Sequence, residues 1–211
     1  MAWFMSLIYD RFMSNVEEAC LVEWRADLLR DLAGEVLEIG AGTGANLPHY
    51  PRAVTRLVLT EPDRHMRLKL HERVWHERAR APSPSRALDI TPAPSDALPF
   101  PDSTFDAVVS TLVLCSVPDP ARSLAEMRRV LRPAGKLIYL EHVAAEDRPD
   151  RLAWQRRIEP AWKHLAGNCH LTRRTADTIR AAGFTIDREQ RESMHKAMFF
   201  TRPTIRGVAH K

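Results

Sequence analysis

The sequence has no uninterrupted apolar run of about eighteen residues, the length that a membrane-spanning helix requires. The opening segment "MAWFMSLIY" is apolar but short, and no positively charged stretch precedes it, so a signal peptide is not expected. We expect this segment to form the apolar face of an amphipathic helix. Any contact with a membrane is expected to be weak surface attachment through residues 1–9.

Cysteine is also scarce, because the chain has only Cys20, Cys115 and Cys169 and no CxxC spacing. An odd count without paired spacing argues against a disulfide framework and fits a reducing, cytoplasmic location. Histidines are scattered along the chain, and His71 and His76 do not share one helical face. We therefore predict no metal site from the sequence.

Charge of one sign is not concentrated anywhere in the chain. The 31 basic and 27 acidic residues are interleaved and leave a net charge of +4, which is typical of a solvated surface. We expect no nucleic-acid partner. With 211 residues, 45% of them hydrophobic, the chain is predicted to form one compact domain with a substantial core.

Apolar runs and helical periodicities alternate along the sequence. Helical spacing begins in residues 1–33, where an apolar row runs from Phe4 to Trp24 in steps of four. Strands are predicted at 34–40, 57–60, 87–90, 105–117, 136–143, 184–192 and 201–211, and further helices at 63–79, 120–135, 150–166 and 172–182. Alternating strands and helices indicate βαβ units and a largely parallel sheet that is covered on both faces.

The first strand runs directly into three glycines in "EVLEIGAGTGAN". Gly40, Gly42 and Gly44 leave bare backbone where a ligand can approach closely, at the carboxyl end of a parallel strand. Amides beyond such a turn can point at a polar or negative ligand group. The spacing differs from the dinucleotide pattern GxGxxG, so the glycines alone do not identify the ligand.

Three acids complete this pattern. Glu61 ends the second predicted strand, seventeen residues after Gly44, where a carboxylate can accept hydrogen bonds from two ribose hydroxyls. Glu38 lies inside an apolar strand and needs a partner, so we expect it to orient the glycine loop and the cofactor. Asp96 follows the third strand and can accept from an adenine amino group. Together they predict an adenosine cofactor.

These motifs, with "LTEPD", "DALPFPDSTFDAVVST" and "EMRRVLRPAGKLIYLEHV", resemble class I S-adenosylmethionine (SAM)-dependent methyltransferases. The resemblance implies an α/β, Rossmann-like, doubly wound seven-stranded sheet of order 3-2-1-4-5-7-6 with the last strand antiparallel. It implies a helical lid at 1–33, a SAM-binding core at 34–145, and a substrate cap with closing strands at 146–211. SAM is the implied cofactor, S-adenosylhomocysteine the product, and the implied cofactor-binding residues are Glu38, Gly40, Ala41, Gly42, Gly44, Asn46, Glu61, Pro62, Asp96, Ala97, Thr111 and Leu112.

A narrower resemblance covers the rest of the chain. The segments "TLVLCSV", "LEHVAAE", "WQRRIEPAWKHLAGNCHLTR" and "IRGVAHK" are similar to the methyltransferase-like thiol S-methyltransferases, which methylate alkyl thiols. Animal members carry a long N-terminal membrane anchor, which we do not expect in this protein. The sequence also has Ala134 before Gly135 where the wider family often has two glycines, and Pro94 where it often has Gly or Asp.

The reacting thiol must lose its proton, since a free thiol has a pKa near 8.5. His142 follows the fifth strand at its cofactor end and is the expected catalytic residue, as a base or as a partner of the thiolate. A structural histidine bonded to backbone is the alternative. Further residues expected to line an apolar acceptor site are Tyr9, Phe12, Glu141, Trp162, His164 and Cys169.

Two other functions remain compatible with the cofactor motifs. An N- or C-methyltransferase acting on a phospholipid headgroup or a quinone shares these motifs, and "YDRFMS" near the N-terminus is compatible with such enzymes. A non-catalytic SAM-binding protein would also keep the glycine loop and the ribose acid. The physiological acceptor and the oligomeric state are not indicated by the sequence.

Overall fold

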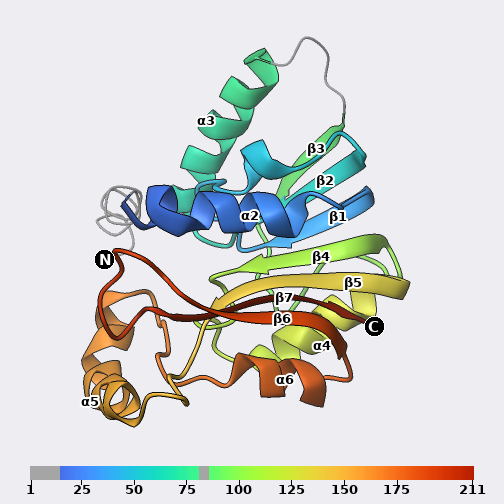
Figure 1. Ribbon diagram of the computed structural model, residues 1–211. Coiled ribbons are helices and arrows are strands. Elements are labelled where there is room, and N and C mark those ends of the chain that lie inside the picture. The colour runs from blue at the N-terminus through green and yellow to red at the C-terminus, as the bar shows by residue number, and fades with distance from the viewer. Residues whose placement is uncertain (1–14, 81–85) are drawn as a thin grey trace.

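The computed structural model describes residues 15–80 and 86–211, whose strands form one seven-stranded sheet (Figure 1). The strands are β1 (Gly34–Ile39), β2 (Val54–Thr60), β3 (Ala87–Thr91), β4 (Phe105–Thr111), β5 (Leu131–His142), β6 (Thr185–Ser193) and β7 (Pro203–His210). Their order, β3-β2-β1-β4-β5-β7-β6, confirms the predicted topology. Strands β1 to β5 pair in parallel, whereas β7 is antiparallel to both β5 and β6.

Helical elements fill most of the connections. They are η1 (Glu17–Leu21), α2 (Val22–Leu29), η2 (Leu47–His49), α3 (Arg64–Arg80), α4 (Pro120–Val130), α5 (Pro149–Leu165) and α6 (Thr175–Ala181). Helix α4 begins where the sequence favours a helix start. Asp119 accepts a hydrogen bond from the amide of Arg122 at 3.0 Å, and Pro120 occupies the first turn, where its missing N–H costs nothing.

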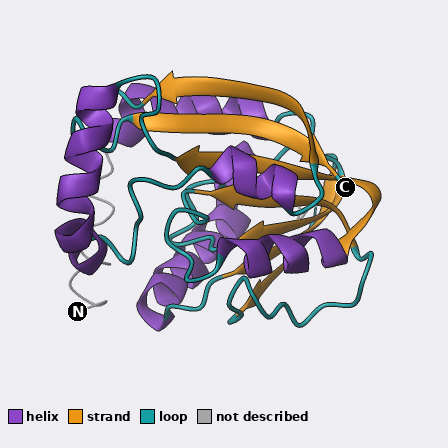
Figure 2. Cartoon of the chain, turned by 90° about the horizontal axis from the view of Figure 1, so that it is seen from below, coloured by secondary structure: helices purple, strands orange, loops and turns teal. Residues whose placement is uncertain are grey.

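The core consists of two layers, one on each face of the sheet. Neighbouring residues of β1 belong to different layers: Val36 packs with η1, α2 and α3, whereas Leu37 packs with α4 and α6. Figure 2 shows helices on both sides of the strands. This two-sided burial explains why the parallel strands read as continuous apolar runs in the sequence.

The described part of the predicted N-terminal row is buried. Val16, Cys20 and Trp24 are 4%, 5% and 8% exposed, which confirms the period-four prediction for these positions. Tyr9 and Phe12 lie outside the described residues. Two large apolar side chains of α5, Trp154 and Leu165, are not part of the core, because they are 51% and 66% exposed.

Helix α5 is instead attached to the rest of the molecule through a polar side chain. Gln155 is fully buried, accepts from the amide of Ala145 at 2.8 Å and donates to the carbonyls of Val143 and Phe200. Helix α5 is therefore held in place by an amide side chain rather than by a stripe of apolar residues. The consequence is an α5 surface with large exposed apolar side chains.

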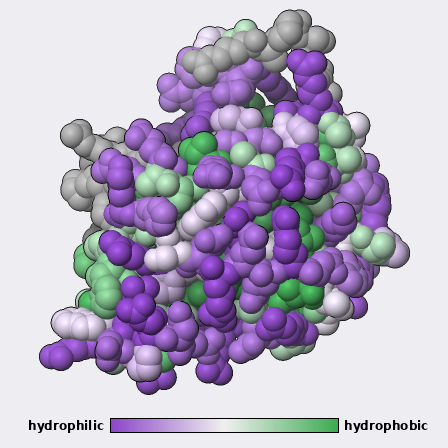
Figure 3. Space-filling view, viewed as in Figure 1, coloured by the Kyte–Doolittle hydropathy of each residue, from purple (hydrophilic) through white to green (hydrophobic). Residues whose placement is uncertain are grey.

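The molecular surface mixes polar and apolar residues, as the interleaved charges predict. Figure 3 shows a mostly hydrophilic face on which hydrophobic side chains form separate patches. Among the helices that the structure describes, none is both long and apolar enough to cross a membrane.

Strand β7 contains a glycine that its neighbours leave no room to replace. A Cβ atom on Gly207 would lie 2.3 Å from the carbonyl oxygen of Arg188 on β6 and 2.6 Å from the hydroxyl of Tyr139 on β5. We predict that Gly207→Ala lowers the free energy of unfolding by about 1–3 kcal/mol through overpacking, measured by urea denaturation.

The same variant should lose amide hydrogen-exchange protection selectively in β6 and β7. Gly167→Ala is the matched control, because a Cβ there meets no atom within 4 Å and only the backbone at φ 58° is strained. Unchanged protection of β6 and β7 in Gly207→Ala would contradict the close approach.

Candidate active site

The candidate site lies where the strand order reverses, between β1 and β4. Chain segments that follow these two strands leave the sheet on opposite sides, which is where open α/β sheets bind ligands. The two segments touch: a Cβ on Gly40 would lie 2.8 Å from the Val113 side chain. The loop after β1 and the loop after β4 therefore form the two walls of one site.

The glycine loop after β1 has the conformation that the sequence predicts. Gly40, Gly42 and Gly44 have φ angles of 58°, 58° and 86°, which strongly favour glycine. The amide of Ala41 donates to the carbonyl of Thr60 at 2.8 Å and joins the loop to β2. A Cβ on Gly42 would meet no atom within 4 Å, so this part of the backbone faces open space.

Glu61 holds the glycine loop from the end of β2. Its buried carboxylate accepts from the amides of Gly42 and Asp63, both at 2.8 Å. Burial raises the pKa of the carboxyl, and these two amides oppose the rise. Because a carboxylate offers about four lone-pair positions, two remain for ribose hydroxyls.

Behind the loop, a buried network satisfies the second acid. Glu38 is 2% exposed and accepts from the Asn46 side-chain amide at 2.9 Å and the Tyr50 hydroxyl at 2.8 Å. Arg25 of α2 donates to Asn46 and to Thr111 at 2.8 and 3.0 Å. Burial raises the Glu38 pKa to about 7, against the lowering effect of these hydrogen bonds and of the Arg25 charge.

Arg25 and Tyr50 are functional-site residues that sequence reasoning missed. Neither belongs to a motif: Arg25 lies in a helix of apolar character, and Tyr50 follows the short η2 helix. The available signal was the buried Glu38, since a carboxylate inside an apolar strand requires donors from elsewhere. Asn46 and Thr111, which are predicted to contact the cofactor, also belong to this network through their side chains.

The remaining predicted cofactor residues border the same edge of the sheet. Pro62 is exposed after β2, and Asp96 and Ala97 lie in a turn after β3, half-buried and exposed respectively. Leu112 follows β4 with a φ of 59°, and its amide donates to the carbonyl of Leu140 at 2.7 Å. The open backbone at Gly42 and the carboxylate of Glu61 fit the adenosine part of SAM.

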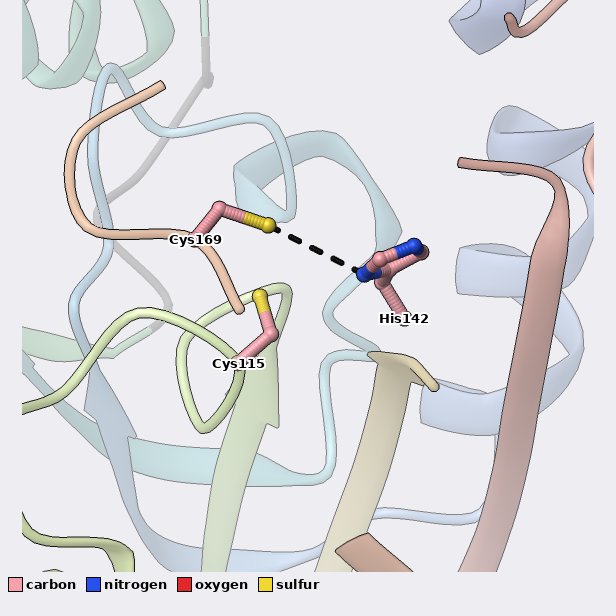
Figure 4. Close-up of side chains that lie close together, drawn as sticks. All are labelled: Cys115, His142 and Cys169. Atoms are coloured by element: carbon pink, nitrogen blue, oxygen red, sulfur yellow. Dashed lines mark hydrogen bonds between the residues drawn. The ribbon is translucent and has the colours of Figure 1, made fainter. Parts of the chain in front are cut away.

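On the other side of the reversal point, two thiols and an imidazole converge from three segments. Cys115 follows β4, His142 ends β5, and Cys169 lies between α5 and α6 (Figure 4). Their ligand atoms all lie within 4.8 Å of one another, and Cys169 Sγ is 3.8 Å from His142 Nδ1. We call these three residues the sulfur–imidazole cluster.

Backbone contacts join the segment 168–173 to the loop after β4. The Asn168 side chain donates to the Ser116 carbonyl and the His170 amide to the Cys115 carbonyl, both at 2.8 Å. The Arg173 guanidinium donates to the carbonyls of Leu114 and Val117. These contacts place Cys169 opposite Cys115 although 54 residues separate them in the sequence.

Glu141 supports the cluster from beneath. It is fully buried, accepts from the Ser110 hydroxyl at 2.7 Å and from the amides of Val113 and Cys115 at 3.2 and 3.3 Å. Burial raises its pKa to about 6, and these donors oppose the rise. Glu141 thus positions the Cys115 loop rather than contacting an acceptor directly.

The two thiols of the cluster differ in pKa. The pKa of Cys169 is lowered, mainly by a hydrogen bond from Cys115 and further by His142 and Trp162, whereas that of Cys115 is raised. His142 is 3% exposed, and its Nε2 has no hydrogen-bond partner among the described residues. His164 is exposed on α5 and does not belong to the cluster.

The fold is shared with solved structures of low sequence identity. The [4+2]-cyclase SpnF superimposes with a TM-score of 0.70 at 19% identity, covering 90% of this chain and 79% of its own. An S-adenosylmethionine dependent methyltransferase from Mesorhizobium loti gives 0.64 at 20% identity, covering 93% and 100%. These similarities establish the fold alone, because one such fold hosts different chemistries.

Family models and curated relatives are more specific. Residues 37–139 and residues 89–192 each match a model described as a methyltransferase domain, and SAM is the cofactor of this domain. Thiol S-methyltransferase TMT1B of Homo sapiens is 36% identical over 176 residues, 83% of this chain and 70% of that protein. TMT1A of Homo sapiens is 34% identical over 192 residues, 87% of this chain and 75% of that protein.

The match to TMT1B of Rattus norvegicus takes in 64% of that protein's length. A phosphatidylethanolamine N-methyltransferase from Cereibacter sphaeroides is 35% identical over 144 residues, which are 67% of this chain and 66% of that protein. The matches to the two human thiol enzymes, over 176 and 192 residues, are longer than the match to the phosphatidylethanolamine enzyme. By these matches, the chain belongs to the thiol S-methyltransferase family of SAM-dependent methyltransferases.

Proposed function

We propose that this protein transfers the methyl group of SAM to the sulfur of a small apolar thiol. The observation that carries the proposal is the sulfur–imidazole cluster, which lies across the Gly40–Val113 contact from the glycine loop. The relatives named thiol S-methyltransferases, 34% and 36% identical, support the same acceptor class.

SAM supplies a methyl group that is already activated on a sulfonium sulfur. The chain must hold that group, bring the acceptor sulfur in line with it and exclude water, and positioning of this kind is worth roughly 7–11 kcal/mol in favourable cases. Gly42 and Glu61 hold the cofactor on one wall of the site. Cys115, His142 and Cys169 receive the acceptor on the other wall, where Cys115 and His142 are buried and Cys169 is half-buried.

Phosphatidylethanolamine is the second candidate acceptor. The 35% identity to the enzyme from Cereibacter sphaeroides favours it, over a shorter stretch than the thiol relatives share. An amine acceptor has to lose a proton as well, but it has no specific affinity for two thiols and an imidazole. We therefore rank it below the thiol.

Incubation with methyl-labelled SAM decides between these acceptors. The panel contains short alkyl thiols, phosphatidylethanolamine vesicles and demethylquinones, and we expect label in the thioether products alone. Label in the phospholipid or the quinone would assign the chain to that acceptor class. Absence of label from every acceptor, with SAM bound, would indicate a non-catalytic SAM-binding protein.

A further prediction concerns Glu61, which is proposed to hold the ribose of the cofactor. Glu61→Gln keeps the size of the side chain but removes the charge that strengthens its hydrogen bonds, each worth about 1.5–3 kcal/mol. We expect the Kd values for SAM and S-adenosylhomocysteine to rise together by roughly 10- to 100-fold, measured by calorimetry. NAD is expected not to bind.

Glu72→Gln is the matched control, since Glu72 is exposed on α3 and the substitution is chemically identical. It should leave both Kd values unchanged. Equal affinity of Glu61→Gln and wild type for SAM would refute the proposed ribose contact.

Another prediction concerns the buried carboxyl group of Glu38. Its pKa of about 7 in the folded protein exceeds the value of roughly 4.3 in an unfolded chain. The folded state therefore favours the protonated carboxyl, and this contribution to stability is complete below the unfolded pKa. It is lost as the pH rises through the folded pKa.

We expect the stability advantage of wild type over Glu38→Gln to decrease between about pH 4 and pH 8, because glutamine does not titrate. Urea denaturation of the SAM-free protein at several pH values measures this difference. Glu72→Gln should follow the wild-type profile. If wild type and Glu38→Gln gave parallel stability profiles, Glu38 would not carry the raised pKa.

A further inference from the structure

The sulfur–imidazole cluster presents three soft ligand atoms to one buried point. In a tetrahedral zinc site, with bonds of ~2.3 Å to sulfur and ~2.0 Å to nitrogen, neighbouring ligand atoms lie about 3.5–3.8 Å apart. Cys169 Sγ and His142 Nδ1 are already 3.8 Å apart, and no pair in the cluster exceeds 4.8 Å. A contraction of about 1 Å or less would complete the geometry.

We infer that Cys115 Sγ, His142 Nδ1 and Cys169 Sγ bind a zinc ion whose fourth position takes the acceptor thiolate. Two thiolates and an imidazole favour zinc over magnesium or calcium, which prefer oxygen ligands. Three protein ligands with one open position is the arrangement of catalytic rather than structural zinc sites. The assignment of the acceptor thiolate as the fourth ligand rests on the proposed function. The assignment of the three protein ligands does not.

Groups around the cluster suit two metal-bound thiolates. The Ser116 hydroxyl lies 3.5 Å from Cys115 Sγ and can donate to it. The buried indole N–H of Trp162, which has no hydrogen-bond partner by distance and angle among the described residues, interacts with Cys169. Arg173 adds a positive charge that acts on both cysteines. Donors and charges of this kind around the ligands tune a metal site.

Segments that carry the ligands are fixed before any metal arrives. Glu141 binds the backbone of the Cys115 loop, and the contacts from Asn168, His170 and Arg173 bind that loop to the Cys169 segment. His142 is held at the paired end of β5, opposite Thr204 of β7. Preformed ligands of this kind reduce the ordering that metal binding would otherwise require.

A bound zinc ion would promote deprotonation of the acceptor thiol, which the reaction requires. A thiol that coordinates zinc is deprotonated, and its proton is released to solvent. The bound thiolate then gives an electron pair to the methyl carbon as the bond from that carbon to the sulfonium breaks. The thiol and SAM become a methyl thioether, S-adenosylhomocysteine and one proton. His142 would then act as a metal ligand, whereas the sequence predicts a base or a partner of the thiolate, with a structural histidine as the alternative.

Metal content of the full-length protein tests the inference directly. Protein from zinc-supplemented cells, purified with a non-thiol reductant and no chelator, should contain about one zinc ion per chain. Replacement by Co²⁺ should produce the intense near-ultraviolet absorption of thiolate-to-cobalt charge transfer. Cys115→Ser, Cys169→Ser and His142→Gln should each weaken metal binding at least tenfold, by analogy with the 10- to 100-fold cost of disturbing ligand partners.

Cys20→Ser is the matched control, because Cys20 is buried in the core layer against η1 and α2, away from the cluster. It should keep the zinc and the cobalt spectrum, and all four variants should retain wild-type affinity for SAM, which shows that they fold. Wild-type protein with neither zinc nor a cobalt–thiolate band would overturn the inference. So would equal metal loss in Cys20→Ser.

Activity separates this inference from the proposed function. Removal of zinc should abolish thiol methylation and leave SAM binding intact, and zinc should restore it. Metal-free protein that methylates thiols at the full rate would refute the zinc inference and leave the proposed function standing. If the cluster bound metal but the protein methylated no thiol, the proposed function would be refuted and the three zinc ligands would stand.

Discussion

The buried carboxylate of Glu38 is the constraint on which the cofactor side of this molecule depends. An unpaired carboxylate in the central strand would be costly, so donors have to reach it. Asn46 and Tyr50 supply two hydrogen bonds, and Arg25 holds Asn46 in turn. One acid thereby joins α2, β1, the glycine loop and the end of β4. The loop that receives the cofactor is held in place because side chains behind it form hydrogen bonds with this carboxyl group and with one another.

Reversal of the strand order between β1 and β4 divides the site into two halves. The glycine loop and Glu61 follow β1 and β2, whereas the sulfur–imidazole cluster comes from the ends of β4 and β5 and from the segment before α6. The Gly40–Val113 contact is the boundary between them.

The cofactor half of the site was predictable from the sequence, and the acceptor half was predictable only in part. Gly40, Gly42 and Glu61 belong to local motifs whose geometry follows from glycine backbone angles and from strand ends. Arg25 and the pairing of Cys115 with Cys169 arise from tertiary packing, which leaves no spacing signal along the chain. The contacts of helix α5 were equally hard to predict from the sequence, because the helix buries the polar residue Gln155 rather than its apolar residues.

A [4+2]-cyclase shares this fold, so the fold alone does not determine which reaction takes place. The residues of the acceptor half therefore have to determine which acceptor reacts. In the proposed reaction the acceptor sulfur lies at the sulfur–imidazole cluster, in line with the methyl group of the cofactor. A crystal structure with S-adenosylhomocysteine and a short alkanethiol measures this directly. We expect the thiol sulfur in contact with Cys115, His142 and Cys169, with an unobstructed straight path to the homocysteine sulfur that leaves room for the transferred methyl group. An alkanethiol bound elsewhere, with the cluster separated from the homocysteine sulfur by intervening protein, would contradict it.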